Sequence, residues 1–245
     1  METQLKSITQ LIKLRAPCVV CKQYHRGKQI VCETCDALMS ALTNACVRCR
    51  ISLDDDNHTV CGSCLKQKKH FDEAICHYQF EEPLRSLIHA FKYDQSLYLA
   101  TFLSSLMLRH KSDIPIQADC LIPVPVHPKR LRERGYNHAL ELTKILAKKL
   151  NKPYKVNLCQ KVIHTPHQVG LKLKERNKNL SNAFHVHQNQ FEHVVIIDDL
   201  MTSGNTANEV AKSLKKSGIQ KVSVWCCARA SIKTHNASGR SAVAG

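Results

Sequence analysis

Residues 194–206, VVIIDDLMTSGNT, constrain the fold and the chemistry of this chain more than any other segment. Four consecutive aliphatic residues predict a buried strand, and the acidic pair Asp198 and Asp199 stands where that strand is expected to end. A loop of hydroxyl side chains and glycine follows, and residues 207–217 have the pattern of a helix. This order is typical of a phosphate-binding site, because backbone N–H groups and the helix dipole face the anion.

The loop indicates which residues would surround that anion. Gly204 allows close approach of the backbone, where a Cβ would intrude. The two carboxylates would repel a phosphate, so they suit sugar hydroxyls or a divalent cation that bridges polyphosphate oxygens. The residues expected to bind are Asp198, Asp199, Thr202, Ser203, Gly204, Asn205 and Thr206.

Position for position, residues 194–206 resemble the ribose-phosphate signature of type I phosphoribosyltransferases. The resemblance implies a site for phosphoribosyl pyrophosphate (PRPP), bound together with Mg²⁺. An ordinary buried strand and turn would need neither two acids nor three hydroxyls. A Walker-type nucleotide loop is excluded, because no Gly-Lys-Ser/Thr triplet stands at the required spacing.

Thirteen cysteines are present, and eight of them form four Cys-x-x-Cys pairs. Two thiolates at this spacing bind one side of a tetrahedral Zn²⁺, and a second pair completes the site. We expect two structural zinc sites with the pairs combined in sequence order; an interleaved arrangement or the loss of one site are the alternatives. The pairs are Cys18/Cys21, Cys32/Cys35, Cys46/Cys49 and Cys61/Cys64.

Zinc binding would supply the stability that this region lacks, since it holds few large apolar residues. A structural zinc contributes roughly 10–16 kcal/mol in zinc-finger peptides. Four thiolate ligands leave no open coordination position, so a catalytic zinc is not expected. The other cysteines lack partners at ligand spacing and are expected to be core or surface thiols: Cys76, Cys120, Cys159, Cys226 and Cys227.

The chain is strongly basic and its charge is uneven. Lysine and arginine outnumber aspartate and glutamate by 36 to 20, a formal net charge of +16. Residues 129–178 hold fourteen of these basic residues against three glutamates. This concentration indicates a surface for a polyanion. The residues expected to contact nucleic acid are Lys129, Lys172, Lys174, Arg176 and Lys178.

From residue 83 onward, helical and strand patterns alternate, which predicts an α/β fold with a parallel sheet and flanking helices. Helices are expected at 83–92, 96–110, 137–150 and 206–217, and strands near 121–126, 155–159, 183–186, 193–198 and 221–227.

Three parts are expected: an N-terminal helix with a double zinc ribbon (1–66), a phosphoribosyltransferase-like domain (67–229) and a disordered tail (230–245). No apolar run is long enough for a membrane span, and the polar N-terminus favours a cytoplasmic location.

A second basic segment, residues 122–138, begins as a strand and then becomes rich in proline and arginine. We expect it to deliver Arg130, Arg132 and Arg134 into a loop that binds a second phosphate, or pyrophosphate, through bidentate contacts. A solvated basic loop is the alternative. Asn137 is well placed to cap the helix that follows.

The motifs together resemble the ComF/ComFC family of competence proteins, which includes the GntX-like proteins. They are the Cys-x-x-Cys pairs, FKY at 91–93, PVPVHPKRLRERGYN, a Thr-x-x-Gln-x-x-Leu segment with a trailing Arg-x-x-Asn, and the PRPP loop. The resemblance covers about residues 17–229. It implies a double zinc ribbon on a phosphoribosyltransferase fold, and a cytosolic role with imported single-stranded DNA in natural transformation. His138 departs from the glutamine usual in the family, and Thr202 stands where purine-salvage enzymes have an acid.

Two functions from different classes follow. In the first, the chain binds PRPP and handles single-stranded DNA, with DNA-import or recombination proteins as partners. In the second, it is a salvage phosphoribosyltransferase that transfers ribose 5-phosphate from PRPP to a nucleobase. The basic surplus and the zinc ribbons favour the first, since salvage requires neither. The loop offers no evident catalytic base, because Thr202 cannot move a proton as an acid would.

Overall fold

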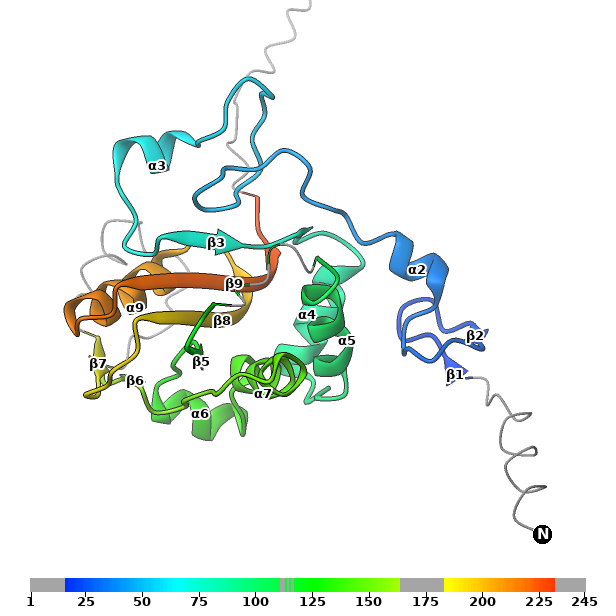
Figure 1. Ribbon diagram of the computed structural model, residues 1–245. Coiled ribbons are helices and arrows are strands. Elements are labelled where there is room, and N and C mark those ends of the chain that lie inside the picture. The colour runs from blue at the N-terminus through cyan, green and yellow to red at the C-terminus, as the bar shows by residue number, and fades with distance from the viewer. Residues whose placement is uncertain (1–15, 111–112, 114, 116, 164–182, 232–245) are drawn as a thin grey trace, which may run out of the picture.

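The computed structural model describes residues 16–110, 113, 115, 117–163 and 183–231. At its centre lies a five-stranded sheet in which every strand pair is parallel (Figure 1). The order is β3 (Glu73–Ile75), β9 (Lys221–Arg229), β8 (His193–Met201) and β5 (Cys120–Pro123). The short strand β4 (Tyr78–Gln79) also pairs with β9, so β3 and β4 share one edge of the sheet. The predicted parallel sheet with flanking helices is confirmed.

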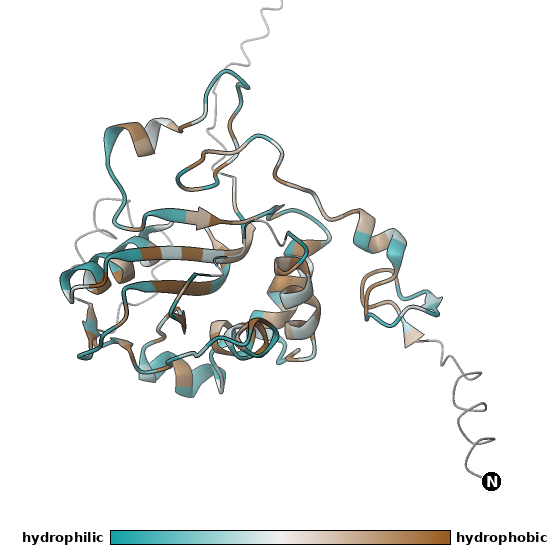
Figure 2. Ribbon diagram, viewed as in Figure 1, coloured by the Kyte–Doolittle hydropathy of each residue, from teal (hydrophilic) through white to brown (hydrophobic). Residues whose placement is uncertain are grey.

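Helices cover both faces of the sheet (Figure 1). Alternate residues of the central strands face opposite sides, as the pleat requires. Val195 and Ile197 pack in one core cluster with helices α4 (Leu84–Tyr93), α5 (Leu99–Met107) and α7 (His138–Leu150). Val194 and Ile196 pack in the other cluster with helix α9 (Asn205–Lys216). The apolar residues gather on the central strands and on the inner sides of the helices (Figure 2).

The cysteine-rich region forms two small modules. The first holds the antiparallel pair β1 (Ala16–Pro17) and β2 (Tyr24–His25) and helix α2 (Glu33–Ala37), and it joins the core cluster of α4 and α5. The second holds α3 (Gly62–Lys66), and its Cys46, Cys49 and Cys64 join the opposite cluster. The two modules therefore join different core clusters.

Three local expectations are wrong. Strand β8 continues through the acidic pair to Met201, because residues 198–201 keep pairing with β9. Strands β6 (Cys159–Lys161) and β7 (Phe184–Val186) form a separate antiparallel pair instead of joining the parallel sheet. The proline- and arginine-rich segment is helical over Pro128–Arg134 (α6), since Pro128 takes the first helical position and His127 accepts a capping bond from the Lys129 amide.

The remaining expected helices and strands lie close to where the sequence places them. Residues 67–82, for which the sequence favours a linker or first strand, contain β3 and β4. In the described residues, no helix combines the length and apolar character needed to cross a bilayer. The expected N-terminal helix, the tail beyond Ser231 and the segment 164–182 lie outside the described residues.

Candidate functional site

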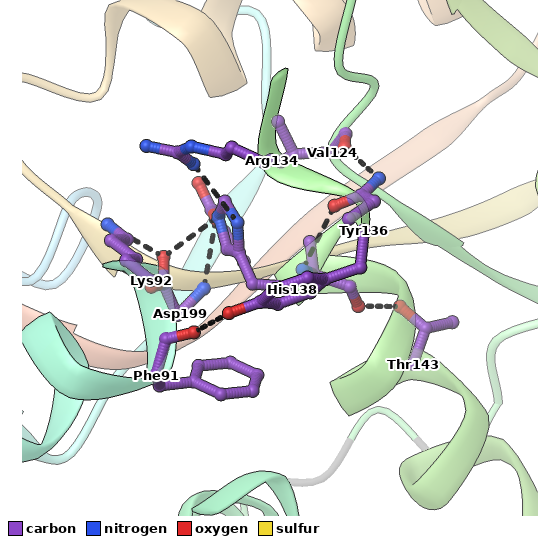
Figure 3. A network of polar contacts seen from close by, with 11 residues as sticks. Phe91, Lys92, Val124, Arg134, Tyr136, His138, Thr143 and Asp199 are labelled. Atoms are coloured by element: carbon purple, nitrogen blue, oxygen red, sulfur yellow. Dashed lines mark hydrogen bonds and ion pairs between the residues drawn. The ribbon is translucent and has the colours of Figure 1, made fainter. Parts of the chain in front are cut away.

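Asp199, the second residue of the acidic pair on β8, meets the side chains of Lys92 and His138 from other elements (Figure 3). Asp199 is fully buried, and its Oδ1 lies 3.1 Å from Nζ of Lys92 on α4. Nε2 of His138, the first residue of α7, lies 3.5 Å from the same Oδ1 and 3.8 Å from Oδ1 of Asp198. The close contact with Lys92 neutralises Asp199, which makes Asp198 the acid that remains available to a ligand.

The surroundings shift the pKa values of these three groups in different directions. Burial lowers the pKa of His138 to about 4, so its imidazole is neutral at pH 7. Burial, together with the charge of Asp199, raises the pKa of Asp198 well above its usual range. Burial alone would also raise the pKa of Asp199, but the neighbouring His138 imidazole and the Lys92 ammonium lower it. Because His138 is neutral, the Lys92 ammonium is the cation that keeps Asp199 ionised.

His138 is oriented by the chain on either side of it. Asn137 caps α7, since its Oδ1 accepts from the Ala139 amide at 3.0 Å, as the sequence predicts. Its Nδ2 donates to the Val124 carbonyl at 3.2 Å, which ties the helix start to the end of β5. The Tyr136 hydroxyl donates to the carbonyl of Phe91, next to Lys92. These bonds bring α4, β5 and α7 together at the carboxyl end of the sheet (Figure 3).

The loop after β8 leads directly into helix α9. Gly204 is the N-cap residue and has φ +75°, a left-handed conformation that favours glycine. Thr202 and Ser203 are exposed, whereas Gly204, Asn205 and Thr206 are half-buried. The N-terminus of α9 and three hydroxyls thus lie next to the acidic pair, in the sequence order expected for a phosphate cradle.

Two of the three arginines predicted in the second basic segment face this site. Arg130 and Arg134 lie four residues apart on α6 and so share one helix face, whereas Arg132 lies on the exposed face. Burial and the charge of Arg134 lower the pKa of Arg130, and burial and Arg130 lower that of Lys161. An anion bound among these cations would relieve their mutual repulsion.

A cavity of about 390 Å³ joins these elements. Its basic lining comes from α4, α6 and β6, and its acidic and hydroxyl lining from β8 and the segment that follows it. The basic residues are Lys92, Arg130, Arg134 and Lys161, and the acidic and hydroxyl residues are Asp198, Thr202 and Thr206. The cavity fits a polyanion that also carries hydroxyl groups, because both kinds of partner line it.

A buried arginine donates hydrogen bonds to the backbone at the start of the loop that follows β8. Arg229 at the end of β9 is 2% exposed, and its Nη1 donates to the carbonyls of Met201, at 2.9 Å, and Thr202. Its Nε donates to the carbonyl of Cys49 at 2.9 Å. The start of the loop is therefore linked through one side chain to the second cysteine module.

The eight paired cysteines gather into two groups of four. Cys18, Cys21, Cys32 and Cys35 form one group and Cys46, Cys49, Cys61 and Cys64 the other, and within each group the Sγ atoms lie within 4.8 Å of one another. The pairs therefore combine in sequence order, as predicted. In each group a backbone N–H donates to a sulfur at 3.3 Å, from Cys32 to Cys18 and from Cys61 to Cys46. Four converging sulfurs with N–H donors are a donor set that suits Zn²⁺. The other five cysteines are buried in the core.

Sequence reasoning missed His138 and Lys92 as members of the site. The FKY motif and the departure at 138 were the available signals, yet neither shows that the two side chains meet one carboxylate. Of the residues expected to contact nucleic acid, Lys129 is exposed on α6. The others, Lys172, Lys174, Arg176 and Lys178, lie outside the described residues, as does the Thr-x-x-Gln-x-x-Leu segment.

Several known proteins are similar to this chain. Competence protein F of Haemophilus influenzae is 33% identical over 226 residues, which cover 87% of this chain and 96% of that protein. DNA utilization protein YhgH of Escherichia coli is 28% identical and covers 81% of this chain and 90% of its own length. Competence protein ComFC of Bacillus subtilis is 23% identical, and the match covers 77% of this chain and 79% of that protein.

No family model matches the chain. Among solved structures, orotate phosphoribosyltransferase from Aeropyrum pernix aligns with 51% of this chain and 56% of its own, at a TM-score of 0.30 and 18% identity. A likeness this distant adds nothing to the description of the site.

Proposed function

The chain belongs to the ComF/ComFC family of competence proteins, and from this premise we propose that it handles imported single-stranded DNA during natural transformation and binds PRPP. The names of its relatives, competence protein and DNA utilization protein, support a role in the use of DNA. The basic surplus supports an anionic partner. We place this activity in the cytoplasm, where imported DNA becomes accessible.

One observation carries the PRPP part of the proposal, namely the mixed lining of the 390 Å³ cavity. Arg130, Arg134 and Lys161 would bind the pyrophosphate group, since charge-assisted bonds to phosphate are strong. The loop 202–206 and the N-terminus of α9 would bind the 5′-phosphate. Asp198 would accept from the ribose hydroxyls or hold the Mg²⁺ that accompanies PRPP.

Mg²⁺ fits this site only in part. His138, Asp198 and Asp199 have ligand atoms within 4.8 Å of one another and could in principle hold an ion. The Lys92 ammonium, 3.1 Å from Asp199, already supplies a positive charge there. We therefore assign Mg²⁺ to the side of Asp198 that faces the cavity. The zinc assigned to the two cysteine groups is structural and stabilises the modules.

Titration calorimetry with PRPP and Mg²⁺ tests the PRPP site. Replacing both acids, Asp198→Ala with Asp199→Ala, is expected to abolish PRPP binding while the chain stays folded, as circular dichroism would show. Asp113→Ala is the matched control, because Asp113 is an acid that lies outside this cavity. An unchanged affinity in the double variant would refute the assignment.

DNA retention as a function of salt tests the other part. Binding that depends on phosphate contacts releases counterions, so affinity should fall steeply as salt rises and depend little on sequence. Retention on single-stranded DNA at low salt and its loss at high salt would support the proposal. The absence of retention even at low salt would refute it.

A second candidate function, a salvage phosphoribosyltransferase, is favoured by one further cavity. This cavity, of about 580 Å³, shares Pro125, Val126, His127 and Lys161 with the first and is mainly apolar. It offers room for an acceptor base beside the ribose. Pyrophosphate release on addition of one nucleobase, lost in Asp199→Ala, would support this function. A panel of bases without turnover, combined with tight DNA binding, would eliminate it.

A further inference from the structure

A continuous ladder of ring and guanidinium contacts runs along the rim of the candidate PRPP cavity. The Arg85 guanidinium lies over the Phe80 ring at 5.6 Å. The centroids of the Phe80 and His89 rings lie 6.3 Å apart with the rings stacked, and those of His89 and Tyr93 lie 5.6 Å apart with the rings tilted by 37°. The Arg134 guanidinium lies over the Tyr93 ring at 5.0 Å. We call these five residues the rim ladder; it has three rings in the middle and one arginine at each end.

The backbone explains why these side chains line up. Arg85, His89 and Tyr93 are spaced by four residues on α4, so they share one face of that helix. This face points away from the core, which is filled by Leu84, Leu87, Ile88 and Phe91. Phe80, just after β4, and Arg134, the last residue of α6, complete the ladder from two other elements.

The ladder is accessible and opens into the cavity. Tyr93 is 59% exposed, far more than a ring used only to fill the core. His89 and Arg85 are also exposed, whereas Phe80 is half-buried and packs against the core beneath. Four of the five residues line the 390 Å³ cavity: Phe80, His89, Tyr93 and Arg134.

The chemistry of the ladder suits unpaired bases. Single strands bind where aromatic rings accept stacked bases and guanidinium groups reach the intervening phosphates. A duplex hides the faces of its bases in the helix stack, so it cannot use exposed rings in this way. Glu81 and Asp94 directly follow Phe80 and Tyr93 in sequence, so the charge around the ladder is mixed. Stacking should therefore contribute more here than general attraction to a polyanion.

We propose that the rim ladder is a stacking platform for single-stranded DNA, placed so that a bound strand enters the mouth of the PRPP cavity. This inference rests on the proposed function and assigns its DNA contact to described residues. Aromatic residues are only 5% of the chain, but three aromatic or imidazole rings are concentrated at this one rim.

Fluorescence anisotropy with the full-length chain tests the platform. The probe is a dye-labelled oligothymidylate of about twenty nucleotides, and its control is an abasic strand of equal length and charge. Tyr93→Ala is expected to weaken oligothymidylate binding roughly five- to 150-fold, the value of one stacked base. Binding of the abasic strand should change little. Tyr93→Phe keeps the ring and should retain affinity, and Tyr154→Ala is the matched control, an exposed tyrosine that does not line the cavity.

The outcomes separate this inference from the proposed function. If the unaltered chain binds the oligothymidylate and Tyr93→Ala binds it equally well, the platform is refuted while DNA handling stands. If the unaltered chain binds neither strand at low salt, both fail. Thermal unfolding of Tyr93→Ala should match the unaltered chain, since the ring is exposed. A variant that fails this check is replaced by His89→Ala, for which the same loss is expected.

Discussion

Arg229 donates from Nε to the carbonyl oxygen of Cys49 at 2.9 Å, across 180 residues of sequence. The same guanidinium donates to the carbonyls of Met201 and Thr202, where the PRPP loop begins. One buried side chain therefore holds the backbone of the second cysteine module and the start of the loop after β8 at fixed positions relative to each other.

Arg229→Met should destabilise the fold. It removes the donor from the buried carbonyls of Cys49 and Met201, and a buried polar group left without its partner costs about 1–3 kcal/mol. We expect the free energy of unfolding in urea to fall by about 3 kcal/mol or more. Arg132→Met, on the exposed face of α6, should change it by no more than about 0.5 kcal/mol. Equal unfolding free energies for Arg229→Met and Arg132→Met would contradict a stabilising role for the Arg229 bonds.

Loss of the second cysteine group should loosen the PRPP loop, and loss of the first should not. Cys46→Ser removes a ligand from the group whose Cys49 carbonyl binds Arg229, whereas Cys18 belongs to the other group. Hydrogen exchange of residues 200–210 should speed up in Cys46→Ser and stay unchanged in Cys18→Ser. Metal analysis should find one zinc per chain fewer in each. Equal exchange in both variants would show that the loop is independent of the module.

The three arginines of α6 should differ in their effect on PRPP. Arg130→Ala and Arg134→Ala each remove a cavity-lining guanidinium, and a hydrogen bond to a charged group is worth about 1.5–3 kcal/mol, or roughly 10- to 150-fold in affinity. Arg132→Ala removes an exposed guanidinium from the same helix and should leave affinity within about twofold. Calorimetry at one salt concentration compares them. An effect of Arg132 as large as the others would indicate long-range attraction instead of binding in the cavity.

His138 should make the fold sensitive to acid. Its pKa is about 4 in the folded chain and about 6.5 when unfolded, so the unfolded chain binds more protons between these values. The contribution of a neutral His138 to the free energy of unfolding is present above about pH 6.5 and is lost as pH falls toward 4. The loss amounts to about 2 kcal/mol by pH 5. His138→Gln should lose this part of the pH dependence. Burial also lowers the pKa of His77 to about 4, so only the difference between variant and unaltered chain is informative.

Gly204→Ala should weaken both the fold and PRPP binding. An L-residue at φ +75° costs about 1–2 kcal/mol, while the new Cβ would meet Met201 only at an ordinary 3.4 Å. We expect a loss of about 1 kcal/mol in unfolding free energy and a lower PRPP affinity as the turn relaxes. Gly62→Ala is the control, because a Cβ there meets open space and no unusual φ is required.

Local sequence patterns were sufficient for much of this fold. Alternating apolar segments predicted the central strands and helices, and the spacing of eight cysteines predicted two groups combined in order. The same patterns failed at α6, where Pro128 and the His127 cap start a helix that arginine content alone does not reveal. They also failed at β6, whose partner β7 is distant in sequence.

The site was harder to predict because its members come from distant elements. Asp198 and Asp199 follow their strand pattern, but no local signal places Lys92 of α4 and His138 of α7 against the same carboxylate. Arg229 is a similar case, since a basic residue at a strand end normally faces solvent. Long-range packing decides these contacts, and it leaves no periodicity in the sequence.

The pairing of β3 with β9 has a consequence for synthesis on the ribosome. Glu73 and Ser223 are joined by a hydrogen bond at 2.6 Å across 150 residues, so the outer strand must wait for its partner until residues 221–229 have been translated. Each cysteine group, by contrast, closes within fewer than twenty residues. The modules can therefore acquire their metal while the sheet is still being made, and a nascent chain arrested before residue 221 should already bind zinc.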